Sequence, residues 1–354
     1  MVATPYWDNG MTRLYHANAR SLPIPDNSVD CVCTSPPYWG LRDYGLGEWE
    51  GGNSDCDHIR VQGDISKSTA GYNANTNHAQ EPWPNKTCGK CGAIRVDDGI
   101  GLEPTPDAYC ANMVEVFREV WRVLKPTGTL WLNLGDSYAG STTHGTRQMP
   151  NGLKSKDLVG IPWRVAFALQ ADGWYLRSDI IWSKPNPMPE SVTDRPTKAH
   201  EYVFLLTKSP RYYYDADAIS EKGTSAIGSI AGYAGYTARA KAMGREPSGN
   251  EANGIVAFNS GNRNKRSVWE ITTQPYPEAH FATYPEKLVE PCILAGCPQD
   301  GVVLDPFAGS GTTLAVAQRL GRKAVGTDLS AEYIALATKR LSGVSLPMIF
   351  SGVE

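Results

Sequence analysis

The stretch from Gly301 to Thr313, GVVLDPFAGSGTT, constrains the fold of this chain most strongly. Val302 to Leu304 form a short apolar run that is typical of a buried parallel strand, and Gly309 and Gly311 permit a tight turn after it. Residues 312–320 then carry apolar side chains at helical spacing. A strand, a glycine loop and a helix in this order let a ligand approach the backbone at the carboxyl edge of a doubly wound sheet. We therefore predict an α/β fold with a mostly parallel sheet.

The residues around this loop indicate what the ligand is. A second predicted strand, residues 324–328, ends in Asp328, whose carboxylate can accept hydrogen bonds from both hydroxyls of a ribose. No Gly-Lys-Ser/Thr follows the glycines, which argues against a phosphate-binding loop. Asp305 precedes the glycines, where it would repel a pyrophosphate. A cationic ligand with an amino group and a ribose fits better, and S-adenosylmethionine has both features.

A second motif, TSPPY at Thr34 to Tyr38, follows the apolar run from Val29 to Cys33. Two consecutive prolines must end a strand or helix there, and they remove two N–H donors. The Ser35 hydroxyl and nearby carbonyls can therefore face a pocket, beside the flat ring of Tyr38. A planar heterocycle with an exocyclic amine would suit such a pocket. The alternative is a proline-rich turn with a packing tyrosine.

Together, TSPPY and DPFAGSGTT resemble the amino-directed DNA methyltransferases in their permuted, beta-type order, over Leu14 to Arg340. The resemblance implies a Rossmann-like S-adenosylmethionine-dependent methyltransferase fold with circularly permuted motif order and insertions. It implies methyl transfer from S-adenosylmethionine to an amine of a flipped-out base in double-stranded DNA. Serine at the first position of the amine motif resembles the cytosine 4-amino enzymes, with adenine 6-amino enzymes as the alternative. Methylation of RNA or of a protein amide, and a non-catalytic zinc adaptor, are more distant alternatives.

The resemblance also assigns candidate site residues. The catalytic residues are Ser35, Pro36, Pro37 and Tyr38. The cofactor-binding residues are Asp305, Phe307, Gly309, Ser310, Gly311, Thr312, Asp328, Phe281 and Pro285. Hydrogen bonds from the amine to Ser35 and to a carbonyl of the proline turn would favour the pyramidal amine, while Tyr38 would stack on the flipped base. No cysteine follows a proline at a comparable place, so methylation of a ring carbon through a cysteine nucleophile is not expected.

From Glu48 to Gly101 the sequence loses its periodicity and is rich in Gly, Asn and Asp, as expected of an insertion. Two short motifs within it, CDH and CGKCG, carry metal-ligand spacing. They predict a structural zinc site of the Cys3His type, with ligands Cys56, His58, Cys88 and Cys91. Free surface thiols are the alternative.

A second change in composition covers residues 208–275, which combine glycines with many basic side chains. In permuted family members the target-recognition region lies between the two motifs, so we assign it here, with a solvated loop as the alternative. Candidate DNA-binding residues are Asn186, Arg239, Arg263, Lys265 and Arg266. The catalytic half of the core then spans residues 1–47 and 102–207, and the zinc segment spans 48–101. The cofactor half spans 276–342, followed by a tail at 343–354.

Composition sets wider limits on the protein. With 354 residues and 41% hydrophobic content, the chain can form one large domain with insertions. The net charge of -3 leaves room for a local basic face on a DNA enzyme, and the eight cysteines argue for thiols or metal rather than disulfides. The apolar runs are too short for a membrane span, and the first ten residues lack the order of a signal peptide. We expect a cytoplasmic enzyme with no membrane partner, and a cognate restriction endonuclease is a candidate partner.

Overall fold

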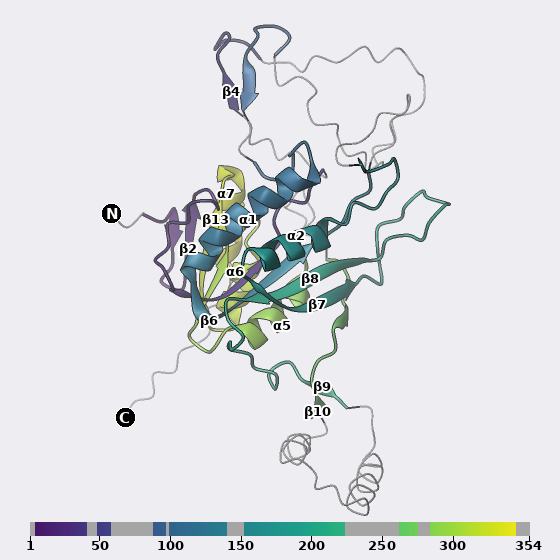
Figure 1. Ribbon diagram of the computed structural model, residues 1–354. Helices are drawn as coiled ribbons and strands as arrows, with labels where there is room; N and C mark the ends of the chain where they lie inside the picture. Colours follow the sequence, from purple (N-terminus) through teal and green to yellow (C-terminus); the bar gives the residue numbers. More distant parts are fainter. Residues whose placement is uncertain are drawn as a thin grey trace, which may run out of the picture.

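The computed structural model describes residues 4–40, 48–57, 88–96, 99–139, 152–223, 262–274 and 284–344. In this part of the chain a nine-stranded sheet forms the centre of the molecule (Figure 1). Its strands, in spatial order, are β1 (Trp7–Asp8), β2 (Thr12–His16), β13 (Lys323–Asp328), β12 (Val302–Asp305), β3 (Val29–Thr34), β6 (Leu124–Leu134), β8 (His200–Thr207), β7 (Tyr175–Ser183) and β11 (Val268–Glu270).

The five strands from β2 to β6 in this order run parallel to their neighbours. Strand β8 is antiparallel to both β6 and β7, and β1 is antiparallel to β2 at the other edge. The predicted mostly parallel α/β sheet is therefore confirmed.

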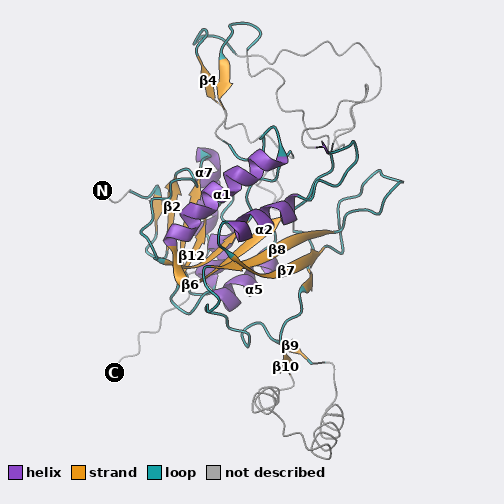
Figure 2. Ribbon diagram, in the orientation of Figure 1, coloured by secondary structure: helices purple, strands orange, loops and turns teal. Residues whose placement is uncertain are grey.

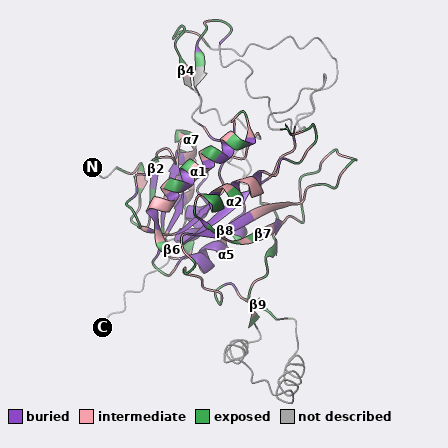
Figure 3. Ribbon diagram, viewed as in Figure 1, coloured by how far each residue is buried: buried purple, intermediate pink, exposed green. Residues whose placement is uncertain are grey.

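Helices cover both faces of the sheet (Figure 2). They are α1 (Pro106–Val123), α2 (Ile161–Ala171), α5 (Glu286–Gly296), α6 (Thr312–Arg319) and α7 (Ala331–Ser342). Strand β3 shows why two layers form, because successive side chains of a strand point to opposite faces. Cys31 and Cys33 pack with residues of α5, α6 and α7, whereas Val32 packs with residues of α1 and α2. Figure 3 shows the buried sheet between these partly exposed helices.

Helix α1 illustrates how local sequence sets these layers. Thr105 caps its first turn, since the Thr105 Oγ1 atom accepts a hydrogen bond from the Ala108 amide at 3.1 Å. Pro106 is tolerated at the first helical position because its missing N–H would have no helical partner there. The buried residues Tyr109, Met113 and Val116 then recur at helical spacing and turn one face of α1 to the sheet.

The order of the strands creates a switch point between β12 and β3. The chain leaves β3, passes through α1 and adds β6 on one side; it leaves β12, passes through α6 and adds β13 on the other side. The two strands pair in parallel, with Val303 opposite Cys31 and Leu304 opposite Val32. Ligands bind in the crevice at the carboxyl ends of the strands at such a point. Both sequence motifs, TSPPY and DPFAGSGTT, begin at these two strand ends.

Strand β6 begins at Leu124, directly after α1, although Pro126 and Gly128 lie within it. Val29 of β3 pairs with Leu124, and the register shifts between Val29 and Cys31, as at a β-bulge. The Gly128 backbone lies close to the Leu124 side chain and leaves no space there for a Cβ atom.

Two smaller sheets lie outside the central one. Strand β4 (Glu48–Glu50) pairs with β5 (Ile94–Val96) within the predicted insertion, and β9 (Glu221–Lys222) pairs with β10 (Asn262–Arg263). Figure 1 shows β4 apart from the central sheet. Across the described ranges, none of the helices combines the length and apolar character that crossing a membrane requires.

Candidate active site

Asp305 joins the two motifs at the switch point. Its carboxylate is 1% exposed and accepts hydrogen bonds through both oxygens. Oδ1 accepts from the Thr34 hydroxyl at 2.6 Å and from the Phe307 amide at 3.1 Å. Oδ2 accepts from the Thr313 hydroxyl at 2.7 Å and from the Tyr284 hydroxyl at 3.1 Å. The first residue of TSPPY is therefore tied directly to the acid of DPFAGSGTT.

The electrostatics of Asp305 follow from this burial. Burial raises the pKa of the Asp305 carboxyl, while the hydrogen bonds from Thr313 and Thr34 oppose that rise. The carboxylate thus depends on its protein donors for stabilisation in the buried state. The cofactor contact predicted for Asp305 stays a prediction, and the structure adds a bridging role between the two loops.

The glycine loop reaches the second predicted acid through its backbone. The Gly309 amide donates to Asp328 Oδ2 at 2.8 Å, and the Ser330 amide donates to Asp328 Oδ1 at 2.8 Å. Burial raises the pKa of Asp328, and these amide hydrogen bonds lower it. Gly309 has a φ of +50°, and a Cβ atom there would meet only the Phe307 carbonyl oxygen, at 3.9 Å. The loop backbone can therefore be approached closely from that side.

Three other residues predicted to bind the cofactor, Ser310, Gly311 and Thr312, contact helix α7. Gly311 has a φ of +79°, and a Cβ atom there would come within 3.1 Å of the Ala337 Cβ atom on α7. The Arg340 guanidinium of α7 donates to Thr312 Oγ1 at 2.9 Å and lies 3.4 Å from Ser310 Oγ. Ser310 and Thr312 thus bind the loop to α7. Pro285 is buried where α5 begins, and Phe281 lies outside the described residues.

The hydroxyls of the TSPPY turn form a chain. Ser35 Oγ donates to the Tyr38 hydroxyl at 3.2 Å, and the Tyr38 hydroxyl donates to Glu201 Oε2 at 2.7 Å. The Pro37 carbonyl accepts from the Tyr109 hydroxyl of α1 at 2.9 Å, which holds the proline turn on the core. The Tyr38 ring lies against Gly135, where a Cβ atom would come within 2.5 Å of the Tyr38 Cε2 atom. Stacking of Tyr38 on a base stays a prediction.

Sequence analysis missed three residues around this chain of hydroxyls. Asn133 Nδ2 donates to Glu201 Oε2 at 2.9 Å, and the Lys184 ammonium pairs with the other oxygen of Glu201. The side chains of Lys184 and Glu201 are 17% and 16% exposed. Burial and then Glu201 raise the pKa of Tyr38 well above its ordinary value, so the phenol keeps its proton at neutral pH. A signal was present in the sequence, because Asn133 and Glu201 are polar residues at the ends of apolar strands.

The residues predicted to bind DNA lie near the β7–β11 edge or outside the described ranges. Arg263 and Arg266 both form ion pairs with Glu221, at 3.0 and 2.6 Å, and the Lys265 ammonium lies 5.3 Å from the centre of the Trp269 ring. Asn186 Oδ1 accepts from the Thr273 amide at 3.0 Å. Arg239 lies outside the described part of the chain. The DNA contacts of all these residues stay predictions.

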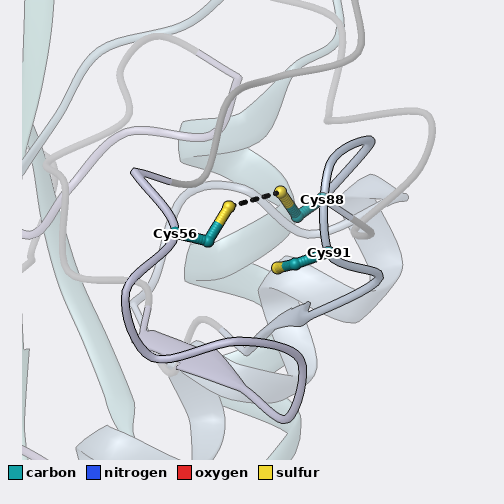
Figure 4. A group of neighbouring side chains, drawn as sticks. All are labelled: Cys56, Cys88 and Cys91. Atoms are coloured by element: carbon teal, nitrogen blue, oxygen red, sulfur yellow. Dashed lines mark hydrogen bonds between the residues drawn. The ribbon is translucent and has the colours of Figure 1, made fainter.

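Three of the four predicted metal ligands converge. The Sγ atoms of Cys56, Cys88 and Cys91 all lie within 4.8 Å of one another, as Figure 4 shows for their side chains. His58, the fourth predicted ligand, falls outside the described residues.

The strand order, the switch point and the pairing of a glycine loop with Asp328 define a Rossmann-like methyltransferase fold in which the strand that ends in TSPPY precedes the strand that leads to the glycine loop. Comparison with known proteins identifies the family. The family model described as "DNA methylase" matches residues 29–339, and the chain belongs to this family.

Individual relatives agree with this assignment. The Type II methyltransferase M.Cfr9I of Citrobacter freundii is 39% identical over 351 residues, covering 95% of this chain and 89% of that protein. The Type II methyltransferase M.SmaI of Serratia marcescens is 40% identical over 326 residues, covering 88% of this chain and 84% of that protein. The solved structure of the PvuII DNA methyltransferase (cytosine-N4-specific) shares the fold, with a TM-score of 0.58, 17% identity, and coverage of 99% of this chain and 90% of that chain.

Proposed function

We propose that this DNA methyltransferase transfers a methyl group from S-adenosylmethionine to the exocyclic 4-amino group of cytosine in a base flipped out of double-stranded DNA. One observation carries the proposal: the Thr34 hydroxyl donates to Asp305 at 2.6 Å and so holds the amine motif beside the glycine loop, at the switch point of the sheet. A cofactor on the loop and an amine at Ser35 would then share one crevice.

The residues around the glycine loop fit the proposed cofactor. Open space above Gly309 admits a ligand to the backbone, and the half-buried carboxylate of Asp328 lies next to it. Each Asp328 oxygen accepts one amide hydrogen bond and has a further lone pair for a ribose hydroxyl. A small cavity at the carboxyl end of β3 is lined by Thr34, Asn133 and Tyr284, together with apolar residues of α5. S-adenosylmethionine would supply an electrophilic methyl group on a positively charged sulfur.

Ser35 is suited to accept a hydrogen bond from the target amine. Its own proton is directed to Tyr38, and the proton of Tyr38 is directed to Glu201. The remaining lone pairs of Ser35 Oγ are therefore available as acceptors. An amine that donates to Ser35 is drawn toward the pyramidal form, in which the nitrogen lone pair leaves the ring system and can attack.

The same chain of hydroxyls offers a route for the proton that the amine must lose. A methylated amine carries one extra proton, which Ser35 accepts while it passes its own proton to Tyr38. Tyr38 in turn passes its proton to the Glu201 carboxylate, so one proton leaves the amine and one arrives at Glu201. The direction of donation, from Ser35 to Tyr38 to Glu201, supports this route. Lys184 and Asn133 hold Glu201 in place.

The choice of cytosine over adenine rests on Ser35, since serine at this motif position resembles the cytosine 4-amino enzymes. Adenine methylated at its 6-amino group is the second candidate. The relatives named as Type II methyltransferases support a role in restriction and modification, with a cognate endonuclease that recognises the same DNA site. We place target recognition in residues 208–275, including Arg239, Arg263, Lys265 and Arg266, with Asn186 at the adjoining turn.

Replacing Ser35 with alanine tests the proposed role of the hydroxyl. We expect turnover to fall by about 10²-fold, the usual effect of losing one catalytic hydrogen bond, with little change in cofactor affinity. Methyl transfer from labelled S-adenosylmethionine to unmethylated DNA gives the turnover, and calorimetry gives the affinity. Ser28→Ala is a matched control, because the Ser28 hydroxyl only bonds the Pro25 carbonyl in the loop before β3. Equal losses of turnover and affinity in Ser35→Ala would refute this role.

A further inference from the structure

The converging cysteines come from two separate stretches of the chain. Cys56 lies shortly after β4, whereas Cys88 and Cys91 lie in the turn before β5. The antiparallel pairing of Glu48 with Val96 and of Glu50 with Ile94 brings these stretches together. The Sγ atoms of Cys56 and Cys88 are 3.8 Å apart, and all three sulfur atoms lie within 4.8 Å of one another (Figure 4).

The backbone around the two-cysteine turn is shaped to present both sulfur atoms on one side. The Cys88 amide donates to the Ala93 carbonyl at 2.7 Å, and the Gly92 amide donates to the Cys88 carbonyl at 2.9 Å. Gly92 adopts a φ of +72°, which favours glycine. Gly52 closes the other side, since a Cβ atom there would come within 2.8 Å of the Cys91 sulfur.

An ion pair adds a further contact between the two stretches. The Lys90 ammonium, in the two-cysteine turn, pairs at 2.6 Å with Asp57, the residue that follows Cys56.

A disulfide explains this cluster less well than a metal ion. The Sγ atoms of Cys56 and Cys88 are 3.8 Å apart, well beyond the roughly 2.05 Å of a bond between sulfur atoms. Such a bond would also leave Cys91 without a role. Among residues 49–57 and 88–94, the buried ones are Cys88 and Ala93, so the small β4–β5 sheet has very little apolar core. Small segments of this kind commonly depend on a metal ion for their stability.

We propose that Cys56, Cys88 and Cys91 are thiolate ligands of a structural zinc ion that ties the residues after β4 to the turn before β5. Zinc fits because it prefers sulfur and nitrogen ligands in a tetrahedral arrangement and undergoes no redox change. The fourth position of that tetrahedron was assigned to His58 from the sequence, and this assignment remains outside the described residues.

The three proposed ligands lie on the inserted segment, which branches from the core beside the TSPPY turn. The Gly40 amide donates to the Gly101 carbonyl at 2.8 Å, and the Trp39 indole donates to the Glu103 carbonyl at 2.9 Å. The chain therefore leaves and re-enters the core just after the TSPPY turn. Loss of the metal should loosen the insertion, while the central sheet keeps its own core.

Metal analysis of the full-length protein tests the proposal. We expect about one equivalent of zinc after gel filtration, and a thiolate-to-cobalt charge-transfer band when cobalt replaces zinc. Dialysis against a competing chelator should reduce the zinc content of Cys91→Ser by at least about tenfold relative to the wild type. Cys110→Ala is the matched control, since Cys110 lies on α1 outside the cluster, and it should retain zinc. Limited proteolysis of Cys91→Ser should cut first within residues 48–101.

A second measurement covers the case in which the cysteine variants fail to fold. In the wild-type protein, a chelator should release the zinc and expose three additional reactive thiols, identified by mass spectrometry as Cys56, Cys88 and Cys91. Thiols that react equally with and without chelator would overturn the proposal. A preparation with neither zinc nor a cobalt band, or one with a disulfide between Cys56 and Cys88, would overturn it as well.

Discussion

Asp305→Ala is expected to lower the free energy of unfolding by about 3 kcal/mol and methyl transfer by about 10²-fold. The carboxylate is the common acceptor for Thr34, Phe307, Thr313 and Tyr284. Alanine leaves these buried donors without their acceptor, and each unsatisfied group costs about 1–3 kcal/mol when it cannot rearrange. The TSPPY turn and the glycine loop then lose the contact that holds them together, and a displacement of about 1 Å can cost 10²-fold in rate.

Asp305→Asn distinguishes the hydrogen bonds of this side chain, which link Thr34 to Thr313 and Tyr284, from its negative charge. An asparagine keeps the shape of the side chain, and the hydroxyls of Thr313 and Tyr284 can rotate to accept from its amide. We therefore expect Asp305→Asn to lose only about 1 kcal/mol of stability, as measured by denaturant unfolding of both variants. If Asp305→Asn were as damaging as Asp305→Ala, the negative charge would matter rather than the bridge, and the account of this residue would be wrong.

Glu201→Ala is the second variant with a large expected effect. Its removal leaves the Lys184 ammonium without its counterion and takes the acceptor away from Tyr38 and Asn133. We expect the free energy of unfolding to fall by about 2 kcal/mol, since this pair is largely but not fully buried, and turnover to fall by about 10²-fold. Stopped assays of methyl transfer and chemical unfolding measure the two effects on the same preparation.

Asp194→Ala provides the comparison for Glu201→Ala. Asp194 pairs with Lys156 at 2.7 Å, but the two side chains are 56% and 73% exposed. Exposed ion pairs contribute at most about 1 kcal/mol, so this variant should keep nearly all its stability and turnover. A Glu201→Ala protein that matched Asp194→Ala in both measurements would remove Glu201 from the proposed proton route.

The strand, loop and helix of the predicted cofactor half could be predicted because the residues that determine them are neighbours in the sequence. Apolar runs and glycines within residues 301–328 predict β12, α6 and β13 nearly as they occur, at Val302–Asp305, Thr312–Arg319 and Lys323–Asp328. The bridging role of Asp305 was not predictable in the same way, because Thr34 is 271 positions away in the chain. Only the pairing of β12 with β3 brings the two residues together.

The other site residues that the sequence did not single out also have their partners far away along the chain. Glu201 and Asn133 each stand in a mostly apolar run of the sequence, and neither run indicates a partner far along the chain. The antiparallel pairing of β6 with β8 places these two residues beside Tyr38. The thiols of the insertion were found more easily, because cysteine spacing is a strong signal even though Cys56 and Cys88 are 32 positions apart.

Mass spectrometry of the nucleosides identifies the atom of DNA that this enzyme methylates. Unmethylated DNA is incubated with the enzyme and labelled S-adenosylmethionine, then digested, and the labelled nucleoside is identified. We expect a cytosine methylated at its 4-amino group. An adenine methylated at its 6-amino group would preserve the mechanism and change only the base specificity assigned from Ser35. A cytosine methylated at a ring carbon, or cofactor binding with no labelled DNA, would refute methylation of an exocyclic amine.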